Sequence, residues 1–562
     1  MALFLLDHGA GNVQSLANSI KKLRYQFSWI SSPEDFQRAS VLIFPGQGAF
    51  HTAIECLTAR GLLQPLLDFV NSGKPYFGIC IGMQVLFASS AESPSVRGLG
   101  VIPCQINRFS DTDKAVPHMG WNTAECFDSP SDPQSMEGIS TDSFYYFVHS
   151  YCVPYDPVQN PEAAQWTHST TQYGNEVFVS TVRKGNVFGT QFHPEKSGVA
   201  GLTILDTWIR QSLIGRTPVT PIASRIPRLP KPKDGFTKRI IACMDVRAND
   251  QGDLVVTKGD QYDVREKVSS SSATVNAAGA VRNLGKPVAL ASKYYDAGAD
   301  ELCLLNITSF RNSPLCDQPM LAVVRAAAER VFVPLTIGGG IKDTVDPDGT
   351  KRPALEVASA YFRVGADKVS IGSEAVYAVE KLRTLGSGDG TSAIEAISKM
   401  YGRQAVVVSI DPKRVYVDPA TYDGPYKAEL IYGEDDEPMN GRRKAWWYQC
   451  TVSGGRELRP ISAVELAKGA QALGAGEILL NSIDKDGTGA GFDLDLIRMV
   501  KNAVTIPVVA SSGAGSTKHF VDVFKETNVE SALAAGIFHR DEVDIQDVKV
   551  SVKAAGFNTR VI

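Results

Sequence analysis

The sequence predicts two α/β domains: an open α/β sheet over residues 1–214 and a (β/α)8 barrel over residues 237–562. The first observation is length, because 562 residues are too many for one hydrophobic core. The second is a proline-rich stretch, residues 215–236, which indicates a semi-rigid linker because proline favours extended backbone. The third is the alternation of short apolar runs with helix-length segments on both sides of that linker.

Composition excludes several classes of protein. The 43% hydrophobic and 21% charged residues are ordinary for a globular protein, and a net charge of −4 does not indicate a nucleic-acid surface. No apolar run reaches the ~18 residues of a membrane span. The apolar start lacks a basic leader and a cleavage site, so we expect a first β-strand and not a signal peptide. The nine cysteines form no CxxC pair, which favours reduced thiols in the cytoplasm over disulfides, and we expect no metal and no cofactor.

Short apolar runs mark the expected strands of each domain. In the first part they suit the buried strands of an α/β sheet, because glycines bound them. These runs are residues 3–6, 41–44, 76–79, 144–148, 177–182 and 187–191. In the second part eight runs are spaced as a (β/α)8 barrel requires. They are residues 239–246, 301–307, 333–337, 368–371, 405–410, 477–483, 507–511 and 532–535.

Three segments of the second part have a similar copy further along the chain, in the same order. The pairs are 243–246 with 409–412, 299–306 with 475–482, and 333–340 with 506–513, about 166 to 176 residues apart. This order predicts a barrel duplicated from a four-stranded half. Two polar interruptions, residues 268–282 and 415–446, follow the first and fifth strands, where they are either substrate lids or tolerated insertions.

Cys80 stands between two glycines, in the segment Gly78-Ile-Cys-Ile-Gly82. Glycine at both places permits a sharp strand-to-helix turn that presents the thiol near helix-terminal N–H groups, which favour the reactive thiolate. His193 and Glu195 follow another strand-like run, and Pro194 between them ends that strand so that both side chains can turn towards one site. A nucleophile needs a base that a third group orients, so we predict a Cys80–His193–Glu195 triad.

These motifs resemble the class I glutamine amidotransferases, over about the first 200 residues. The resemblance implies a flavodoxin-like α/β fold in which Cys80 attacks the glutamine amide, His193 moves the proton and Glu195 holds the imidazole. It also implies a set of residues that bind the tetrahedral oxygen and the glutamine: Gly46, Gln47, Gly48 and Gln84.

Asp245 and Asp411 end matching strands of the two barrel halves. A carboxylate there is costly in a core and useful at the catalytic face, so we predict an acid–base pair. Glycine and serine clusters follow other strands, where backbone amides can bind phosphate, and their equivalent places in the two halves predict a substrate with two phosphates. The residues concerned are Gly339, Gly340, Ser370, Gly372, Ser511, Ser512, Gly513, Gly515 and Gly536.

Longer segments, among them residues 7–12, 117–122, 238–245 and 481–488, are similar to the imidazole glycerol phosphate synthases. The similarity implies that ammonia from glutamine combines with a bis-phosphorylated ribotide, phosphoribulosyl-formimino-aminoimidazole-carboxamide ribotide. The products would be imidazole glycerol phosphate, for histidine biosynthesis, and aminoimidazole carboxamide ribotide. Because both activities would lie on one chain, we expect no obligatory partner subunit, and no nucleic-acid or membrane partner. The similarity also implies substrate contacts by Lys258, Asp486, Gly487 and Thr488.

Charged residues begin four of the expected barrel strands, at the end opposite the catalytic face: Arg239, Glu301, Lys368 and Glu477. Their alternating charges predict a salt-bridged ring, which the same resemblance marks as an ammonia gate and which is otherwise a structural plug. Free ammonia would be protonated in water, so the two sites need a dry path, and the barrel axis is the natural route. The resemblance also pairs Lys196 with Asp367 across the domain interface.

Two other functions compete with this interpretation. One is a glutaminase joined to a different phosphosugar barrel, such as a pyridoxal phosphate synthase, which would need a Schiff-base lysine where we find the two aspartates. The other is a non-catalytic scaffold, against which the complete set of Cys80, His193 and Glu195 argues.

Overall fold

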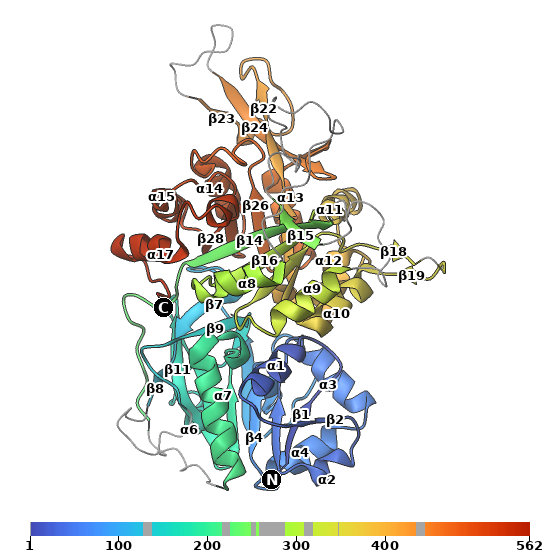
Figure 1. The fold of residues 1–562 in the computed structure, drawn as a ribbon, viewed down its shortest axis with the longest axis vertical. Coiled ribbons are helices and arrows are strands. Elements are labelled where there is room, and N and C mark those ends of the chain that lie inside the picture. Colours follow the sequence, from blue (N-terminus) through green and yellow to red (C-terminus); the bar gives the residue numbers. More distant parts are fainter. Residues whose placement is uncertain are drawn as a thin grey trace, which may run out of the picture.

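The computed structural model describes residues 2–127, 138–215, 225–248, 254–257, 287–307, 319–346, 348–433 and 444–561. Two α/β bodies are stacked along its long axis, the N-terminal body below and the barrel above (Figure 1). The first body ends with helix α7 (Gly198–Leu213), and the second begins with strand β14 (Arg239–Ala248). None of the described helices has the length and apolar character that crossing a bilayer requires.

An eight-stranded sheet forms the first body. Five neighbouring strands are parallel, and three antiparallel strands extend the sheet on one side. In spatial order they are β2 (Ser28–Ile30), β1 (Leu3–Leu6), β3 (Val41–Phe44), β4 (Tyr76–Ile79), β13 (Val187–Thr190), β12 (Glu176–Lys184), β11 (Thr167–Tyr173) and β8 (Glu125–Cys126). β1, β3 and β4 are buried along their whole length, so the apolar start of the chain is a strand, as predicted.

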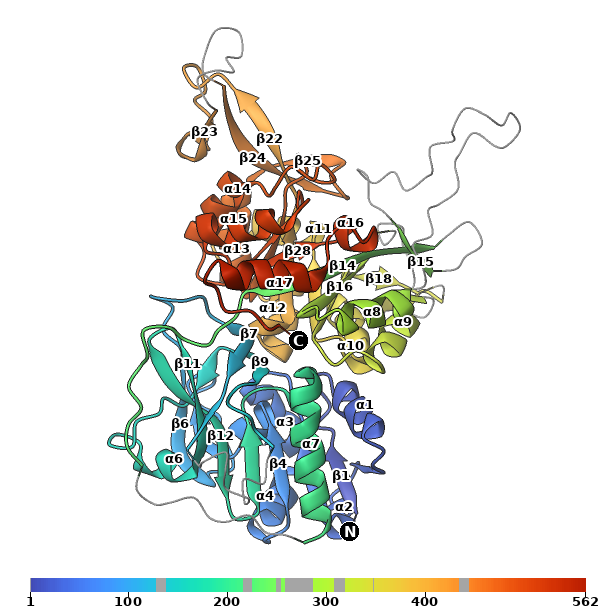
Figure 2. The same ribbon diagram turned by 60° about the vertical axis from the view of Figure 1, so that its left-hand side comes forward.

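Helices surround this sheet, and Figure 2 shows α7 running along it. The other helices of this body are α1 (Gln14–Lys22), α2 (Asp35–Arg38), α3 (Phe50–Ala59), α4 (Leu63–Asn71), α5 (Ile81–Gln84) and α6 (Pro161–Trp166), with one 3-10 turn, η1 (Pro194–Lys196). A small separate sheet contains β10 (Tyr151–Cys152), β6 (Ile102–Arg108) and β5 (Phe87–Ser90).

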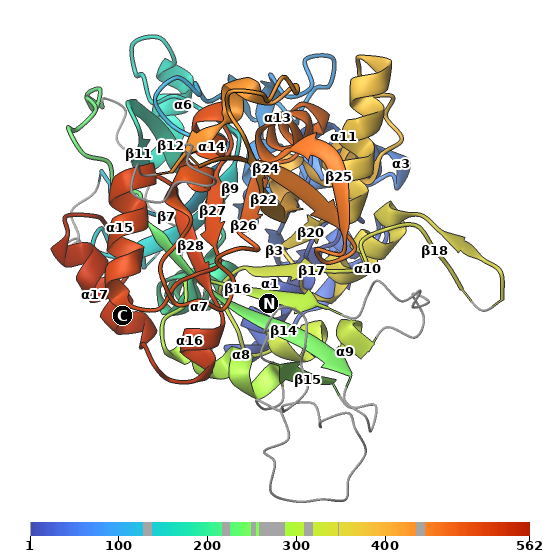
Figure 3. The same cartoon turned by 90° about the horizontal axis from the view of Figure 1, so that it is seen from above.

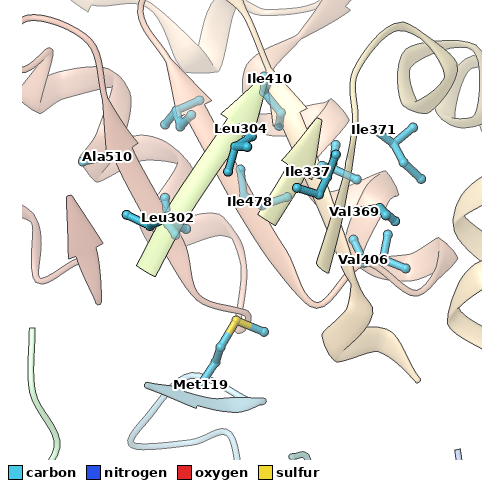
Figure 4. Close-up of a cluster of buried hydrophobic side chains, with 14 of the residues drawn as sticks. Met119, Leu302, Leu304, Ile337, Val369, Ile371, Val406, Ile410, Ile478 and Ala510 are labelled. Carbon is cyan, nitrogen blue, oxygen red and sulfur yellow. The ribbon is translucent and has the colours of Figure 1, made fainter. Parts of the chain in front are cut away.

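Residues 144–148 form a strand, as predicted, but the prediction that this strand belongs to the main sheet was wrong. β9 (Phe144–His149) pairs with β7 (His118–Thr123) in a separate antiparallel ribbon at the junction of the two bodies (Figure 1). Met119 of this ribbon points towards the foot of the barrel strands (Figure 4). Trp121 packs in the same buried cluster, and its Nε1 donates to the Asp300 carbonyl at 3.0 Å. The apolar run is buried by the barrel and not by neighbouring strands of the sheet.

Eight parallel strands close the second body into the predicted barrel, because β14 pairs with both the second and the last of them. Seen from above, the strands surround a common axis and the helices lie outside them (Figure 3). After β14 the strands are β16 (Glu301–Asn306), β17 (Leu335–Gly338), β20 (Lys368–Ile371), β21 (Val406–Ile410), β26 (Glu477–Asn481), β27 (Val508–Ser511) and β28 (Ser531–Ala534). The three pairs of similar segments contain strands four places apart in this order, as duplication predicts.

The large apolar core of this body lies between the strands and the outer helices. These helices are α8 (Pro287–Asp296), α9 (Pro319–Ala328), α10 (Ala354–Val364), α11 (Ser373–Leu385), α12 (Ala393–Tyr401), α13 (Ala463–Leu473), α14 (Leu494–Ala503), α15 (Thr517–Thr527), α16 (Gly536–His539) and α17 (Ile545–Ala554). Two short 3-10 turns are η3 (Arg403–Ala405) and η4 (Lys427–Glu429).

Extra strands extend the barrel at its upper end. β15 (Leu254–Thr257) pairs with β14, and β18 (Thr344–Val345) forms a hairpin with β19 (Lys351–Arg352). An antiparallel arm projects at the top of Figure 1 and contains β22 (Pro412–Val417), β23 (Ile431–Tyr432), β24 (Ala445–Val452) and β25 (Glu457–Ser462). The predicted interruption at 415–446 belongs to this arm, although 434–443 lie outside the described residues, as does the whole of 268–282.

Candidate active site

A strained turn between β4 and α5 presents Cys80. This residue has φ 52° and ψ −103° and is only 7% exposed. A Cβ atom on Gly78 would overlap the Gly82 carbonyl, and one on Gly82 would overlap the Phe44 carbonyl. Both glycines are therefore needed for the elbow, as the sequence predicts.

His193 and Glu195 meet at the end of β13. His193 Nδ1 lies 2.7 Å from Glu195 Oε1, and both residues are buried. Burial alone would lower the pKa of His193, but Glu195 and then Cys80 outweigh it and raise that pKa to about 10. A protonated imidazole beside Cys80 is placed to give up a proton next to the sulfur. The three predicted triad members are thus brought together.

Gln191 joins this site, although the sequence reasoning gave it no role. Its Nε2 donates to Cys80 Sγ at 3.4 Å, and its Oε1 accepts from Gln84 Nε2 at 3.0 Å. Gln84 also donates to the Tyr151 carbonyl. Gln191 lies two residues before His193, directly after the buried strand β13. This closeness to His193 was the only feature of the sequence that could have indicated a role for Gln191.

Asp367 is the centre of the contact between the two bodies. It is 4% exposed and lies just before barrel strand β20. Its Oδ2 is 2.7 Å from Lys196 Nζ, the predicted pair, and accepts from the Leu335 N–H at 2.8 Å. Its Oδ1 accepts from Asn12 Nδ2 at 2.8 Å and from Gln47 Nε2 at 3.1 Å. One barrel carboxylate therefore touches three separate segments around the triad.

The four charged residues at the foot of the barrel form the predicted ring. Arg239 lies 2.7 Å from Glu301 and 2.5 Å from Glu477, and Lys368 lies 2.7 Å and 2.5 Å from the same two carboxylates. All four side chains are buried. Burial would raise the pKa of Glu477, but Arg239 and Lys368 hold that pKa below its usual value. The ring is closed and electrically balanced.

We predict that Glu477→Gln destabilises the barrel by about 3–5 kcal/mol, because it leaves buried cations with too little opposing charge. Chemical denaturation followed by circular dichroism measures this loss. Glu526→Gln is the control, since Glu526 is 58% exposed and 3.7 Å from Arg498, and it should change stability by less than about 1 kcal/mol. Equal effects of the two substitutions would contradict the importance of the ring.

The ring adjoins the triad on one side and an apolar interior on the other. Tyr146 belongs to ribbon strand β9 at the domain junction, near the charges of Glu301, Arg239 and Glu477. Burial raises the pKa of Tyr146 well above its usual value. The Tyr146 carbonyl accepts the His193 N–H at 2.9 Å. Above the ring, small and aliphatic side chains line the barrel axis: Ile241, Cys243, Cys303, Val407, Leu479, Val509 and Leu533.

Asp245 and Asp411 lie at the upper end of that interior. Arg239 and Asp245 share the inner face of β14, about 20 Å apart at ~3.3 Å per residue. Burial, with a contribution from Asp486, raises the pKa of Asp245 to about 7. Burial also raises the pKa of Asp411, although its bonds from Asn481 Nδ2 at 2.7 Å and from Ser409 oppose this. The carboxyl group of Asp245 is therefore poised to hold or release a proton near neutral pH, and that of Asp411 keeps its proton to higher pH than an exposed carboxyl group does.

The raised pKa of Asp245 predicts a pH-dependent cost in stability. Between pH 4 and 7 the folded chain keeps a proton on Asp245 that the unfolded chain has lost. The contribution of Asp245 to the free energy of unfolding therefore falls as pH rises through that window. Asp245→Asn should therefore stabilise the barrel at pH 8, by at most about 4 kcal/mol, and by clearly less at pH 5. Denaturant unfolding at both pH values measures the difference. Asp541→Asn, at a side chain 70% exposed, is the control, and a gain independent of pH would refute the assignment.

A pocket of about 110 Å³ gathers Asp245 with part of the predicted phosphate-binding set at the ends of β27 and β28. The predicted residues that line it are Asp486, Gly487, Ser511, Ser512, Gly513 and Gly536. The lining residues that were not predicted include His539 and Arg540. His539 ends the short helix α16 after β28 and Arg540 follows it, and no sequence pattern singled out either residue.

The remaining predicted phosphate-binding residues do not line this pocket. Gly339 and Gly340 have left-handed φ values of 87° and 80° after β17, and Ser370 and Gly372 follow along β20, in the other half of the barrel. The Gly515 N–H donates to His519 Nδ1 at 3.0 Å, and Thr488 donates to the Lys485 carbonyl. Lys258 lies outside the described residues.

Two known families match consecutive parts of the chain. Residues 4–210 match the family described as glutamine amidotransferase class-I, and residues 239–544 match the family described as histidine biosynthesis protein. The triad lies in the first match, and both aspartates lie in the second. The two matches together account for both domains.

Relatives match the chain over nearly its whole length. The imidazole glycerol phosphate synthase hisHF of Emericella nidulans is 51% identical over 99% of this chain and 98% of its own. That of Schizosaccharomyces pombe is 51% identical over 98% of both chains, and the chloroplastic protein of Arabidopsis thaliana is 49% identical over 99% of this chain and 89% of its own. These matches decide against a pyridoxal phosphate synthase and against a non-catalytic scaffold. The chain belongs to the imidazole glycerol phosphate synthase family, as a single-chain enzyme with a glutamine amidotransferase domain and a cyclase domain.

Proposed function

We propose that this enzyme releases ammonia from glutamine at Cys80, His193 and Glu195 and consumes it at Asp245 and Asp411. The second substrate is phosphoribulosyl-formimino-aminoimidazole-carboxamide ribotide, and the products are imidazole glycerol phosphate and aminoimidazole carboxamide ribotide. The observation that carries this proposal is the order of the three sites: the triad contacts Tyr146 at the domain junction, the charged ring closes the foot of the barrel, and the two aspartates lie beyond its apolar interior.

The geometry of the triad supports a thioester mechanism. The Cys80 thiolate attacks the amide carbon of glutamine, and His193, with its high pKa, supplies the proton with which ammonia leaves. Glu195 keeps the imidazole oriented through Nδ1. Water then hydrolyses the glutamyl thioester to glutamate. Gly46, Gln47 and Gly48 form the oxyanion segment of this proposal, and Gln84 holds Gln191 against the thiol.

Ammonia passes from this site through the ring into the barrel. A path through apolar side chains keeps ammonia neutral and away from water, which preserves it as a nucleophile. Because Arg239, Glu301, Lys368 and Glu477 form a closed ring, passage requires at least one of these ion pairs to part. The ring then acts as the ammonia gate.

At the upper face, Asp245 and Asp411 serve as the acid–base pair for ring closure. Two anion sites, one beside each half-barrel's glycine cluster, hold the two phosphates of the ribotide. The pocket around Ser511, Gly513 and Gly536 is one of them, with Asp486, Gly487 and Thr488 beside it. The other contains Gly339, Gly340, Ser370 and Gly372. Lys258 completes the substrate contacts in this proposal.

We divide the chain into a glutaminase domain over residues 1–214, a linker over 215–236 and a cyclase domain over 237–562. The proposal includes a cytoplasmic location, as the scattered cysteines predict, although the Arabidopsis relative is named chloroplastic. Both substrates are small molecules, and the enzyme needs no second subunit.

The test is an assay of imidazole glycerol phosphate with the purified chain, the ribotide and either glutamine or ammonium. We expect product with both nitrogen sources and one glutamate per product with glutamine. Product with ammonium but none with glutamine would overturn the assigned coupling, and no product with either would overturn the assigned substrate.

A further inference from the structure

The pocket that we assign to one phosphate of the ribotide has carboxyl groups in its wall. Asp245 and Asp486 both line it, and they are close enough that Asp486, after burial, raises the pKa of Asp245. A phosphate monoester carries a charge of about −1.5 to −2 at pH 7. Backbone amides alone would leave this charge facing the two carboxyl groups, so a tightly bound phosphate needs a cation in the same wall.

Arg540 supplies that cation. It is the one lysine or arginine among the described residues that line the pocket, and its side chain is 36% exposed, so a substrate can reach it. His539 also lines the pocket, but burial, then Arg540 and Lys293, lower the pKa of His539 to about 4. The imidazole is therefore neutral at pH 7, and the positive charge of the described wall belongs to Arg540.

Glu542 fixes the direction of the Arg540 guanidinium. Nε of Arg540 donates to one carboxylate oxygen of Glu542, and Nη2 donates to the other at 2.7 Å. Nη1 lies at the other end of the guanidinium, where a Cβ atom added to Gly536 would be 2.8 Å from it. Because Gly536 also lines the pocket, this contact places Nη1 at the pocket wall. A guanidinium held in this way can donate charge-assisted hydrogen bonds to phosphate oxygens.

We propose that Arg540 binds the phosphate of the ribotide in this pocket through Nη1, and that Glu542 is a positioning residue that holds the guanidinium there. The inference rests on the proposed function, because its ligand is the ribotide of that reaction. Arg540 contacts the phosphate and not the reacting atoms, so it stabilises the bound substrate and the transition state equally. An interaction of this kind lowers KM and leaves kcat unchanged.

The test measures product formation from ammonium, at varied ribotide concentration, by the full-length wild type, Arg540→Met and Arg540→Lys. Methionine removes the charge and keeps an unbranched side chain. Loss of a charge-assisted hydrogen bond should raise KM for the ribotide by about 10- to 100-fold, with kcat within about twofold of the wild type. Lysine keeps the charge but not the planar fork, so it should raise KM by only about three- to tenfold.

Arg459→Met is the matched control. Nε and Nη2 of Arg459 donate to the two carboxylate oxygens of Glu380 at 3.0 and 2.6 Å, which is the same fork, but Arg459 does not line the described pocket. This variant should keep the wild-type KM and kcat. A KM that rose less than about threefold in Arg540→Met, with a wild-type circular dichroism spectrum, would overturn the proposal. If Arg540→Met did not fold, an unchanged KM in Arg540→Lys would do so.

The pH dependence of kcat separates phosphate binding from an effect of Arg540 on Asp245. If Arg540 served to hold Asp245 ionised, its removal would move the kcat profile to higher pH. We expect the profile of Arg540→Met to coincide with that of the wild type while KM rises. A shifted profile with an unchanged KM would overturn the proposal. Absence of product from ammonium in the wild type would instead overturn the proposed function.

Glu542→Gln tests the positioning role. Glutamine has nearly the same shape but holds the guanidinium more weakly, so KM for the ribotide should rise by about two- to fivefold with kcat unchanged. In an Arg540→Met background the same substitution should change KM no further. A further rise in that background would show that Glu542 acts apart from Arg540, and would overturn its assignment as a positioning residue.

Discussion

Replacing Cys80 with alanine is expected to abolish product formation from glutamine, by about 10⁴-fold or more, while product formation from ammonium stays within about twofold of the wild type. The thiol is the nucleophile of the proposed thioester, and alanine leaves the elbow intact because it fits the same buried place. Ammonium bypasses the triad and enters the barrel from solution. Glutamate release and imidazole glycerol phosphate are measured separately.

Cys104→Ala is the control for this experiment. Cys104 is another free cysteine of the same domain, but it lies on β6 and touches none of the triad residues by a described hydrogen bond. Its loss should change neither activity. If Cys80→Ala lost both activities together while still folded, the two sites would not divide the reaction as proposed.

Replacing Asp411 with asparagine is expected to abolish product formation with either nitrogen source, by about 10²- to 10⁴-fold. The amide has nearly the same shape, and it can still accept from Asn481, but it can neither take up nor release a proton. The triad is untouched, so glutamate release continues. Parallel assays of glutamate and of imidazole glycerol phosphate, with glutamine and with ammonium, give the result.

Asp389→Asn is the matched control, since Asp389 is exposed between α11 and α12 and bonds only nearby groups such as Thr391. It should retain wild-type product formation. If Asp411→Asn formed product at more than about a tenth of the wild-type rate, Asp411 would not be a member of the acid–base pair. Loss of glutamate release in that variant would point to disturbance of the domain contact.

Much of the fold could be predicted because parallel strands buried on both faces are continuous apolar runs. The runs at 3–6, 41–44, 76–79 and 368–371 coincide with β1, β3, β4 and β20. The run at 144–148 was assigned to the wrong sheet, since an apolar run specifies burial but not the surface that buries it. The ribbon it forms is buried by the barrel, which lies far away in the sequence.

The triad residues, which were predicted from short motifs, do lie together in the structure. Each of these motifs fixes the direction of its side chain through the local backbone geometry. The elbow at Cys80 and the turn at Pro194 are of this kind. The ring could be predicted because strand ends of a barrel meet in space. Gln191 and the bond from Gln47 to Asp367 could not, because a single polar residue carries no pattern and its partner is set only by the packing of the two domains.

Because the connection between the domains is anchored on both of them, the coupling of the two reactions should not change when the enzyme is diluted. Residues 225–238 lie along both bodies: Lys231 N–H donates to Gln172, the Gly174 N–H donates to Asp234, and Asn558 donates to the Asp234 carbonyl. A tether anchored in this way gives each catalytic unit a fixed local concentration of the other, in the millimolar range or above. The yield of cyclised product per glutamine spent is therefore a property of each molecule and not of how many molecules a solution contains.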